Sequence, residues 1–218
     1  MTIYNLIILD ESGSMASIKP ATISGFNELI QRIRMEADKD PEQEQWVNLY
    51  SFNSGGIREL LPLQRATELP QLTEATYRPD AMTPLFDAIG HATGRLRRAL
   101  EGQTGYAVLV TILTDGAEND SKEYSGQAIG QIVRQLEQQH WVFIYMGTNQ
   151  DVQAEAAKIS INNYFSFKYS EADTRDAIHK EATYRSRFYR AAKEGKLDDM
   201  KKDFFKDDEE DGGAAPRS

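Results

Sequence analysis

Hydrophobic residues along this chain follow two patterns, short continuous runs and longer stretches in which apolar residues recur at helical spacing. Continuous runs bounded by turn residues are typical of strands that are buried in a sheet. Such runs predict strands over residues 3–9, 46–52, 57–61, 107–113, 141–146 and 164–169. The sequence Asn53-Ser54-Gly55-Gly56 has the composition of a hairpin turn, so the strand that follows it is expected to pair antiparallel at an edge of the sheet.

Stretches with helical spacing separate most of these strands. They predict helices over residues 24–38, 84–100, 129–136, 152–159 and 170–193. Thr83 suits the N-cap of the second helix, and Pro84 suits its first position, where a missing N–H costs nothing. Residues 62–79 have no clear periodicity, and no element is predicted there. Because strands alternate with helices, we expect an α/β fold with a mostly parallel sheet.

The length of 218 residues suits a single domain. We expect this domain to span residues 1–195, with its core in residues 1–168 and a C-terminal helix over about 170–193. Residues 196–218 are charged, poor in aliphatic side chains and include the acidic run 207–211. This segment is therefore predicted to be a disordered acidic tail.

Charge and composition exclude several classes of protein. The net charge is −9, and no basic face that would suit a nucleic acid is apparent. No apolar stretch approaches the length of a membrane span, and no signal peptide is visible at the N-terminus. The absence of cysteine fits a reducing compartment. We therefore expect a soluble cytoplasmic protein that binds neither nucleic acid nor membrane.

Polar side chains collect where three of the predicted elements begin or end. Asp10, Ser12 and Ser14 follow the first strand, Thr83 precedes the second helix, and Asp115 follows the strand over residues 107–113. The carboxyl ends of parallel strands meet at one edge of a sheet, which is where such sheets place their ligands. Two partly buried carboxylates repel each other, and these loops contain no lysine or histidine to compensate them. A hard divalent cation with oxygen ligands is the natural interpretation.

The order of these residues carries a resemblance to a known family. Asp10-Glu11-Ser12-Gly13-Ser14 matches Asp-x-Ser-x-Ser, which opens the metal-ion-dependent adhesion site (MIDAS) of von Willebrand factor A domains. The segments around Thr83 and Asp115 resemble the other two parts of that site, and the resemblance covers roughly residues 1–168. The chain looks most like the small stand-alone bacterial members. Some of these occur with tellurite-resistance-type stress systems or with AAA+ ATPases.

The resemblance implies a doubly wound, mostly parallel sheet of six strands with one antiparallel edge strand and helices on both faces. It also implies that Ser12, Ser14 and Thr83 ligate the metal directly, whereas Asp10 and Asp115 act mostly through bound waters. The metal is expected to be Mg²⁺, with Mn²⁺ or Ca²⁺ as alternatives, and a glutamate or aspartate of a protein partner would fill the open position. This predicts a non-enzymatic, metal-dependent interaction module in a stress-response or ATPase-associated assembly. The partner, the pathway and the oligomeric state stay open.

The alternative is a magnesium-dependent phosphatase or phosphotransferase in which Asp10 is the nucleophile. Such enzymes generally need a second aspartate where this chain has Ser12, and a lysine near the site. The loops 81–87 and 114–120 contain no lysine, and no glycine-rich phosphate-binding motif occurs. The residues therefore favour binding over catalysis.

The remaining polar residues receive plainer interpretations. Glu11 and Glu118 either support the metal ligands or are solvated residues at the rim of the site, and the rim is favoured; Asn119 and Asp120 stand in the same position and are interpreted as polar loop residues. In the last helix, aromatic rings are expected to face the core and the arginines to form a solvated face. The residues concerned are Tyr184, Arg185, Arg187, Phe188, Tyr189 and Arg190.

Overall fold

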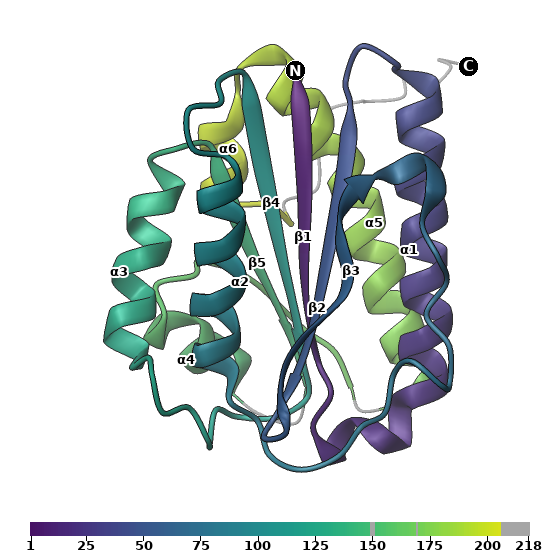
Figure 1. The fold of residues 1–218 in the computed structure, drawn as a ribbon, viewed down its shortest axis with the longest axis vertical. Coiled ribbons are helices and arrows are strands. Elements are labelled where there is room, and N and C mark those ends of the chain that lie inside the picture. Colours follow the sequence, from purple (N-terminus) through teal and green to yellow (C-terminus); the bar gives the residue numbers. More distant parts are fainter. Residues whose placement is uncertain (149–150, 169, 206–218) are drawn as a thin grey trace, which may run out of the picture.

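The strands of this chain form one six-stranded sheet, in the order β3-β2-β1-β4-β5-β6 (Figure 1). The computed structural model describes residues 1–148, 151–168 and 170–205. The strands are β1 (Thr2–Asp10), β2 (Gln45–Asn53), β3 (Gly56–Arg65), β4 (Tyr106–Thr114), β5 (Trp141–Gly147) and β6 (Asn163–Ser166). The helices are α1 (Lys19–Lys39), α2 (Leu85–Ala99), α3 (Gly126–Glu137), α4 (Val152–Lys158), α5 (Glu171–Glu194) and α6 (Leu197–Lys202). Two short 3₁₀ helices are η1 (Gly13–Ile18) and η2 (Ala66–Glu68).

The sheet is parallel except at one edge. β1 pairs in parallel with both β2 and β4, the pairs β4–β5 and β5–β6 are also parallel, and β3 runs antiparallel to β2. Along the chain, β2 and β3 are added on one side of β1, and β4, β5 and β6 are then added on the other side. The predicted doubly wound, mostly parallel fold with one antiparallel edge strand is confirmed.

Helices cover both faces of this sheet (Figure 1). Even-numbered side chains of β1, such as Leu6 and Ile8, pack in a core with α2, α3 and α4. Odd-numbered side chains, such as Ile7 and Leu9, pack in a second core beneath α1 and α5. β1 is therefore buried on both faces, which explains why its sequence is apolar at most positions and not alternating; the exception in its interior, Asn5, is buried and hydrogen-bonded.

Some element boundaries differ from the predicted ones. α1 begins at Lys19, because Pro20 fits in the first turn of a helix, and η1 precedes it. β3 continues through Pro62 to Arg65, beyond the predicted strand 57–61. A proline is tolerated there because β3 is an edge strand with a neighbour on one side only.

The segment that follows α5 belongs to the packed domain. Leu197, Met200 and Phe204 are buried in a cluster with side chains of α5 and the sheet. Asn163 of β6 holds this segment in place: its Nδ2 donates to the carbonyl of Met200 over 3.0 Å, and its Oδ1 accepts from the N–H of Phe204 over 2.7 Å. The prediction of a tail beginning at residue 196 is therefore wrong for residues 197–205. The acidic run 207–211 lies outside the described residues.

Arg185 is buried between α5 and the sheet, with 2% of its surface exposed. The guanidinium forms an ion pair with Glu181 and donates to Oδ1 of Asn5 over 2.5 Å and to Oγ1 of Thr111 over 2.6 Å. The prediction that this arginine belongs to a solvated face is wrong. Glu181 lies one turn away on the same helix, but Asn5 and Thr111 lie on distant strands that the sequence pattern could not connect to Arg185.

None of the helices in the described part of the chain combines the length and the apolar character that a membrane span requires.

Candidate metal site

Asp10 ends β1 at the carboxyl edge of the sheet, and its side chain is fully buried. The register pairs Leu9 of β1 with Leu113 of β4, so the residues that follow on the two strands are neighbours. Oδ2 of Asp10 accepts a hydrogen bond from Oγ1 of Thr114 over 2.6 Å, and Oδ1 accepts one from the N–H of Ser12 over 2.7 Å. Both carboxylate oxygens are thus held by the loops at this edge.

A line of oxygen atoms links the first loop to the loop after β4. Oγ of Ser14 donates to Oδ1 of Asp115 over 2.6 Å, and the hydroxyl oxygens of Ser12 and Ser14 lie 3.2 Å apart. Ser12 and Asp115 are buried, whereas Ser14 is exposed. The site therefore has a buried floor and opens to solvent at Ser14.

Thr83 does not cap α2. The N-cap position is occupied by Pro84, and the Thr83 hydroxyl forms no side-chain hydrogen bond with any residue that the structure describes. Thr83 is nonetheless only 3% exposed. A Cβ added to Gly116 would lie 3.3 Å from Oγ1 of Thr83 and 3.8 Å from Oγ of Ser14, so the threonine hydroxyl lies beside the other donors. The N-cap prediction is wrong, and the hydroxyl is available for a ligand.

The five predicted site residues thus lie at one edge of the sheet, on three different loops. Burial raises the pKa of Asp10 to about 6, against the lowering effect of its hydrogen bonds from Thr114 and Ser12, and the nearby charge of Asp115 raises it further. No lysine, arginine or histidine forms an ion pair with Asp10 within the described part of the chain. A bound cation would balance the charge of the Asp10 carboxylate.

The donor set consists of two carboxylates and three neutral hydroxyls. Within the described ranges, no three His, Cys, Asp or Glu side chains converge as they do in carboxylate- or imidazole-rich metal centres. An oxygen-only set with few carboxylates suits a hard cation such as Mg²⁺, which keeps several of its waters. The residues present therefore fit the metal that the sequence resemblance implies.

Glu11 is a buried residue that contacts the segments around the site, and it does not lie at a solvated rim. Its side chain is 1% exposed, forms an ion pair with Arg58 of β3, and accepts a hydrogen bond from the N–H of Arg78. Tyr77, also buried, donates its hydroxyl to the carbonyl of Asp10 over 2.6 Å. Residues 76–80, for which no element was predicted, thus hold the end of β1 in place. The one feature of the sequence that could have indicated this contact with the end of β1 is Tyr77, an aromatic residue within a polar loop.

Glu118 and Asn119 also differ from the predictions of a solvated rim residue and a polar loop residue. Oε2 of Glu118 accepts the N–H of Phe86 over 2.9 Å, and Oδ1 of Asn119 accepts the N–H of Thr83 over 2.8 Å. Both side chains satisfy backbone groups around the start of α2, so they are structural parts of the site. Single-sequence reasoning could not detect them, because the residues they contact lie more than thirty positions away.

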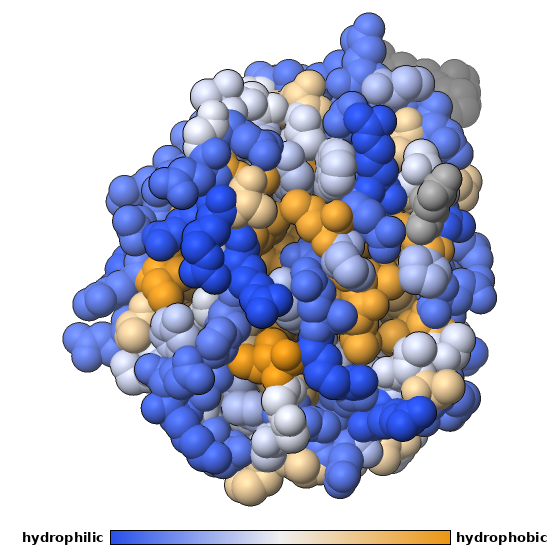
Figure 2. Space-filling view, in the orientation of Figure 1, coloured by the Kyte–Doolittle hydropathy of each residue, from blue (hydrophilic) through white to orange (hydrophobic). Residues whose placement is uncertain are grey.

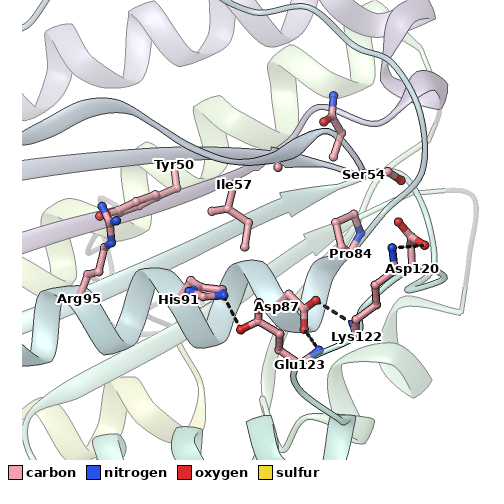
Figure 3. Close-up of a pocket in the computed structure, with 12 residues that line it drawn as sticks. Tyr50, Ser54, Ile57, Pro84, Asp87, His91, Arg95, Asp120, Lys122 and Glu123 are labelled. Carbon is pink, nitrogen blue, oxygen red and sulfur yellow. Dashed lines mark hydrogen bonds and ion pairs between the residues drawn. The ribbon is translucent and has the colours of Figure 1, made fainter.

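A cleft of about 370 Å³ adjoins the site between the β2–β3 hairpin and α2 (Figure 3). It starts at Ser54, which exchanges two hydrogen bonds with the backbone of Met82, and it passes Pro84 and Ile57. In the view of Figure 2, hydrophilic side chains cover most of the surface, and apolar side chains lie in recesses between them. A partner that reached the exposed Ser14 would have this cleft beside it.

Comparison with known proteins identifies the family. The sequence profile of the von Willebrand factor type A domain matches residues 6–181, and the chain belongs to this family. No curated protein sequence matches it. Domains of this family generally serve as protein-interaction modules.

Solved structures with the same fold include three of widely different context. The VWA domain of SpRpn10 is 10% identical with a TM-score of 0.57, over 81% of this chain and 94% of that domain. The vWF domain of the type V pili tip protein Mfa5 from Porphyromonas gingivalis is 9% identical with a TM-score of 0.61, over 84% and 95%. The pilus adhesin SpaC from Lactobacillus rhamnosus GG is 12% identical with a TM-score of 0.62, over 83% of this chain and 29% of the adhesin. At these identities the likeness concerns the fold alone.

Proposed function

We propose that this chain is a non-enzymatic interaction module that captures an acidic side chain of a partner protein through a bound divalent cation. Ser12, Ser14 and Thr83 would hold the metal directly, and Asp10 and Asp115 would hold it through water. Mg²⁺ is the proposed ion, with Mn²⁺ or Ca²⁺ as substitutes. The observation that carries the proposal is the hydroxyl of Thr83, a residue only 3% exposed: it has no side-chain hydrogen bond among the described residues and lies beside Gly116 and Ser14.

The charge of the donor set supports capture of a carboxylate. Only two of the five donors are anionic, so a divalent cation held by them keeps its attraction for a further anionic oxygen. Ser14 is exposed, which gives a partner access to that ion. A glutamate or aspartate of another protein would supply the oxygen without any chemical step.

Catalysis by Asp10 receives less support from the geometry. A nucleophilic carboxylate must reach its substrate directly, whereas Asp10 is 0% exposed and each of its oxygens accepts a hydrogen bond within the fold. Residue 12 is a serine, where a phosphatase of this kind would place its acid–base aspartate. We therefore propose a binding protein, and on the sequence resemblance we place it in a cytoplasmic stress-response or ATPase-associated assembly.

The test compares the wild-type chain with the double variant Ser12→Ala/Ser14→Ala. Isothermal titration with Mg²⁺, followed by affinity capture from a native lysate in Mg²⁺ or in chelator, should show metal binding and metal-dependent partners for the wild type alone. Ser17→Ala is a matched control, because Ser17 is exposed on the same loop and makes no side-chain hydrogen bond with the described residues. Equal capture with and without metal, or by the double variant, would contradict the proposal. Hydrolysis of model phosphate esters by the wild type would favour the enzymatic alternative.

A further inference from the structure

Asn119 forms two hydrogen bonds with the backbone of Thr83. Its Oδ1 accepts the N–H of Thr83 over 2.8 Å, and its own N–H donates to the carbonyl of Thr83 over 3.2 Å. Asn119 lies four residues after Asp115 on the loop that follows β4. One residue, through its side chain and its backbone, thus joins the two loops that bring Thr83 and Asp115 to the site.

Further hydrogen bonds continue this connection along the first turn of α2. Glu118 accepts the N–H of Phe86 over 2.9 Å through Oε2, and the same oxygen accepts the hydroxyl of Ser121 over 2.7 Å. Oγ of Ser121 in turn accepts the N–H of Asp87 over 3.1 Å. The first N–H groups of a helix have no partner within the helix, and here the loop supplies partners for two of them.

The contacts also run in the opposite direction. Asp87 of α2 accepts the backbone N–H groups of Lys122 and Glu123 over 2.8 and 2.9 Å (Figure 3). It also accepts the N–H of Tyr124 over 2.8 Å. Residues 83–87 and 118–124 therefore hold each other reciprocally, and we call this arrangement the α2 clasp. The clasp explains how Thr83 keeps its place although its hydroxyl makes no cap.

We propose that Asn119 is a positioning residue for the metal site, which sets metal affinity by holding the Thr83 hydroxyl against the loop of Asp115. This inference rests on the proposed function. Residues that orient metal ligands without touching the metal contribute measurably to affinity, because a ligand that is free to move loses entropy when it binds. Asn119 is exposed, so shortening its side chain leaves no buried cavity.

The test measures Mg²⁺ affinity by isothermal titration for the full chain. Asn119→Ala should weaken binding by about 10- to 100-fold while the unfolding temperature of the metal-free protein stays near that of the wild type. Asn119→Leu, which keeps the shape but not the acceptor, should lose as much, and Asn119→Asp, which keeps the acceptor oxygen, should bind at least as well as the wild type. Ser125→Ala is the matched control, because it removes a side-chain acceptor at the end of the same loop, for the N–H of Ala128 in the first turn of α3, without touching Thr83.

A double-mutant cycle separates positioning from a general structural role. Once Thr83→Val has removed the hydroxyl, adding Asn119→Ala should change the affinity by less than about threefold, because nothing remains to be positioned. Mn²⁺, which oxygen and nitrogen sites bind more tightly, replaces Mg²⁺ if the Thr83→Val affinity is too weak to measure. Additive losses, or a wild-type affinity for Asn119→Ala, would overturn the inference alone. Absence of metal binding by the wild type would overturn the proposed function and the inference with it.

Discussion

Ser14 donates a hydrogen bond from Oγ to Oδ1 of Asp115 across 2.6 Å, although 101 positions separate the two residues. Their contact follows from the pairing of β1 with β4, which places the loops after both strands side by side. The bond joins a hydroxyl and a carboxylate that we assign to the same cation. The sheet thus brings the residues of the proposed metal site together, and each of its loops can be tested separately.

Mg²⁺ should raise the thermal stability of the wild-type chain. A ligand that binds only the folded state at 100 times its Kd stabilises that state by about 2.7 kcal/mol, which corresponds to roughly 5–10 °C in Tm for a protein of this size. Scanning calorimetry with Mg²⁺ and with chelator measures this difference. Asp115→Ala should show none of it, and an equal shift for this variant would mean that Mg²⁺ binds elsewhere.

The titration of Asp10 should be visible in the metal-free protein. Because its pKa is raised from 3.8 to about 6, the folded chain keeps a proton over a pH range in which the unfolded chain has released it. The stability contributed by protonated Asp10 is therefore complete below about pH 4 and is lost as pH rises through about 6.

Asp10→Asn removes this titration, and its amide can donate to Thr114, whose hydroxyl already contacts the carbonyl of Gly116. Relative to the wild type, the variant should gain up to about 3 kcal/mol between pH 4 and pH 7.5, since each pKa unit corresponds to 1.36 kcal/mol. Urea unfolding in chelator at several pH values measures the difference. Parallel pH profiles for the two proteins would contradict the raised pKa.

Two glycines of α2, one turn apart, should respond oppositely to alanine. A Cβ at Gly90 would lie 2.6 Å from the ring of Tyr124, whose backbone N–H is held by Asp87, so the ring cannot withdraw without moving the clasp. A Cβ at Gly94 would meet only Nη1 of Arg98, at 3.7 Å. Gly90→Ala should therefore cost about 1–3 kcal/mol, whereas Gly94→Ala should add up to about 1 kcal/mol.

Chemical denaturation of both glycine variants gives the two free energies directly. Gly90→Ala should also weaken Mg²⁺ binding, because Tyr124 and Asn119 lie on the same loop, whereas Gly94→Ala should leave it unchanged. If both substitutions raised the free energy of unfolding, the α2 clasp would be able to accommodate a Cβ at Gly90 without loss of stability.

The buried pair of Glu181 and Arg185 should behave differently when one partner or both are replaced. Glu181→Ala alone leaves the guanidinium buried without its counter-charge and should cost about 3–5 kcal/mol. Glu181→Leu together with Arg185→Met removes both charges and should cost clearly less than the sum of Glu181→Leu alone and Arg185→Met alone. Guanidinium denaturation of the two singles and the double checks this. Additive losses would mean that the pair does not act as a unit.

Much of the architecture could be predicted from the sequence alone. Continuous apolar runs at residues 3–9, 107–113 and 141–146 indicated strands buried on both faces, and the alternation with helices indicated a parallel sheet. These patterns are local, because a strand buried on two faces favours apolar side chains at nearly every position. The motif Asp10 to Ser14 could likewise be recognised in the sequence, since its residues lie within one loop.

The supporting residues of the site could not be predicted in this way. Glu11 and Asn119 look like solvated loop residues in the sequence, and their partners Arg58 and Thr83 lie tens of positions away. The same holds for Leu197 and Phe204, which stand among charged residues and are buried only because the sheet offers them a surface.

The sequence by itself therefore determined the order of strands and helices and indicated which oxygen-bearing side chains we propose as metal ligands. Only the tertiary structure showed that Asn119 holds the backbone of Thr83, and that Asp10 is buried without an ion-paired cation among the described residues. The physical reason is that periodicity reports burial along one element, whereas hydrogen bonds and charges depend on which elements become neighbours.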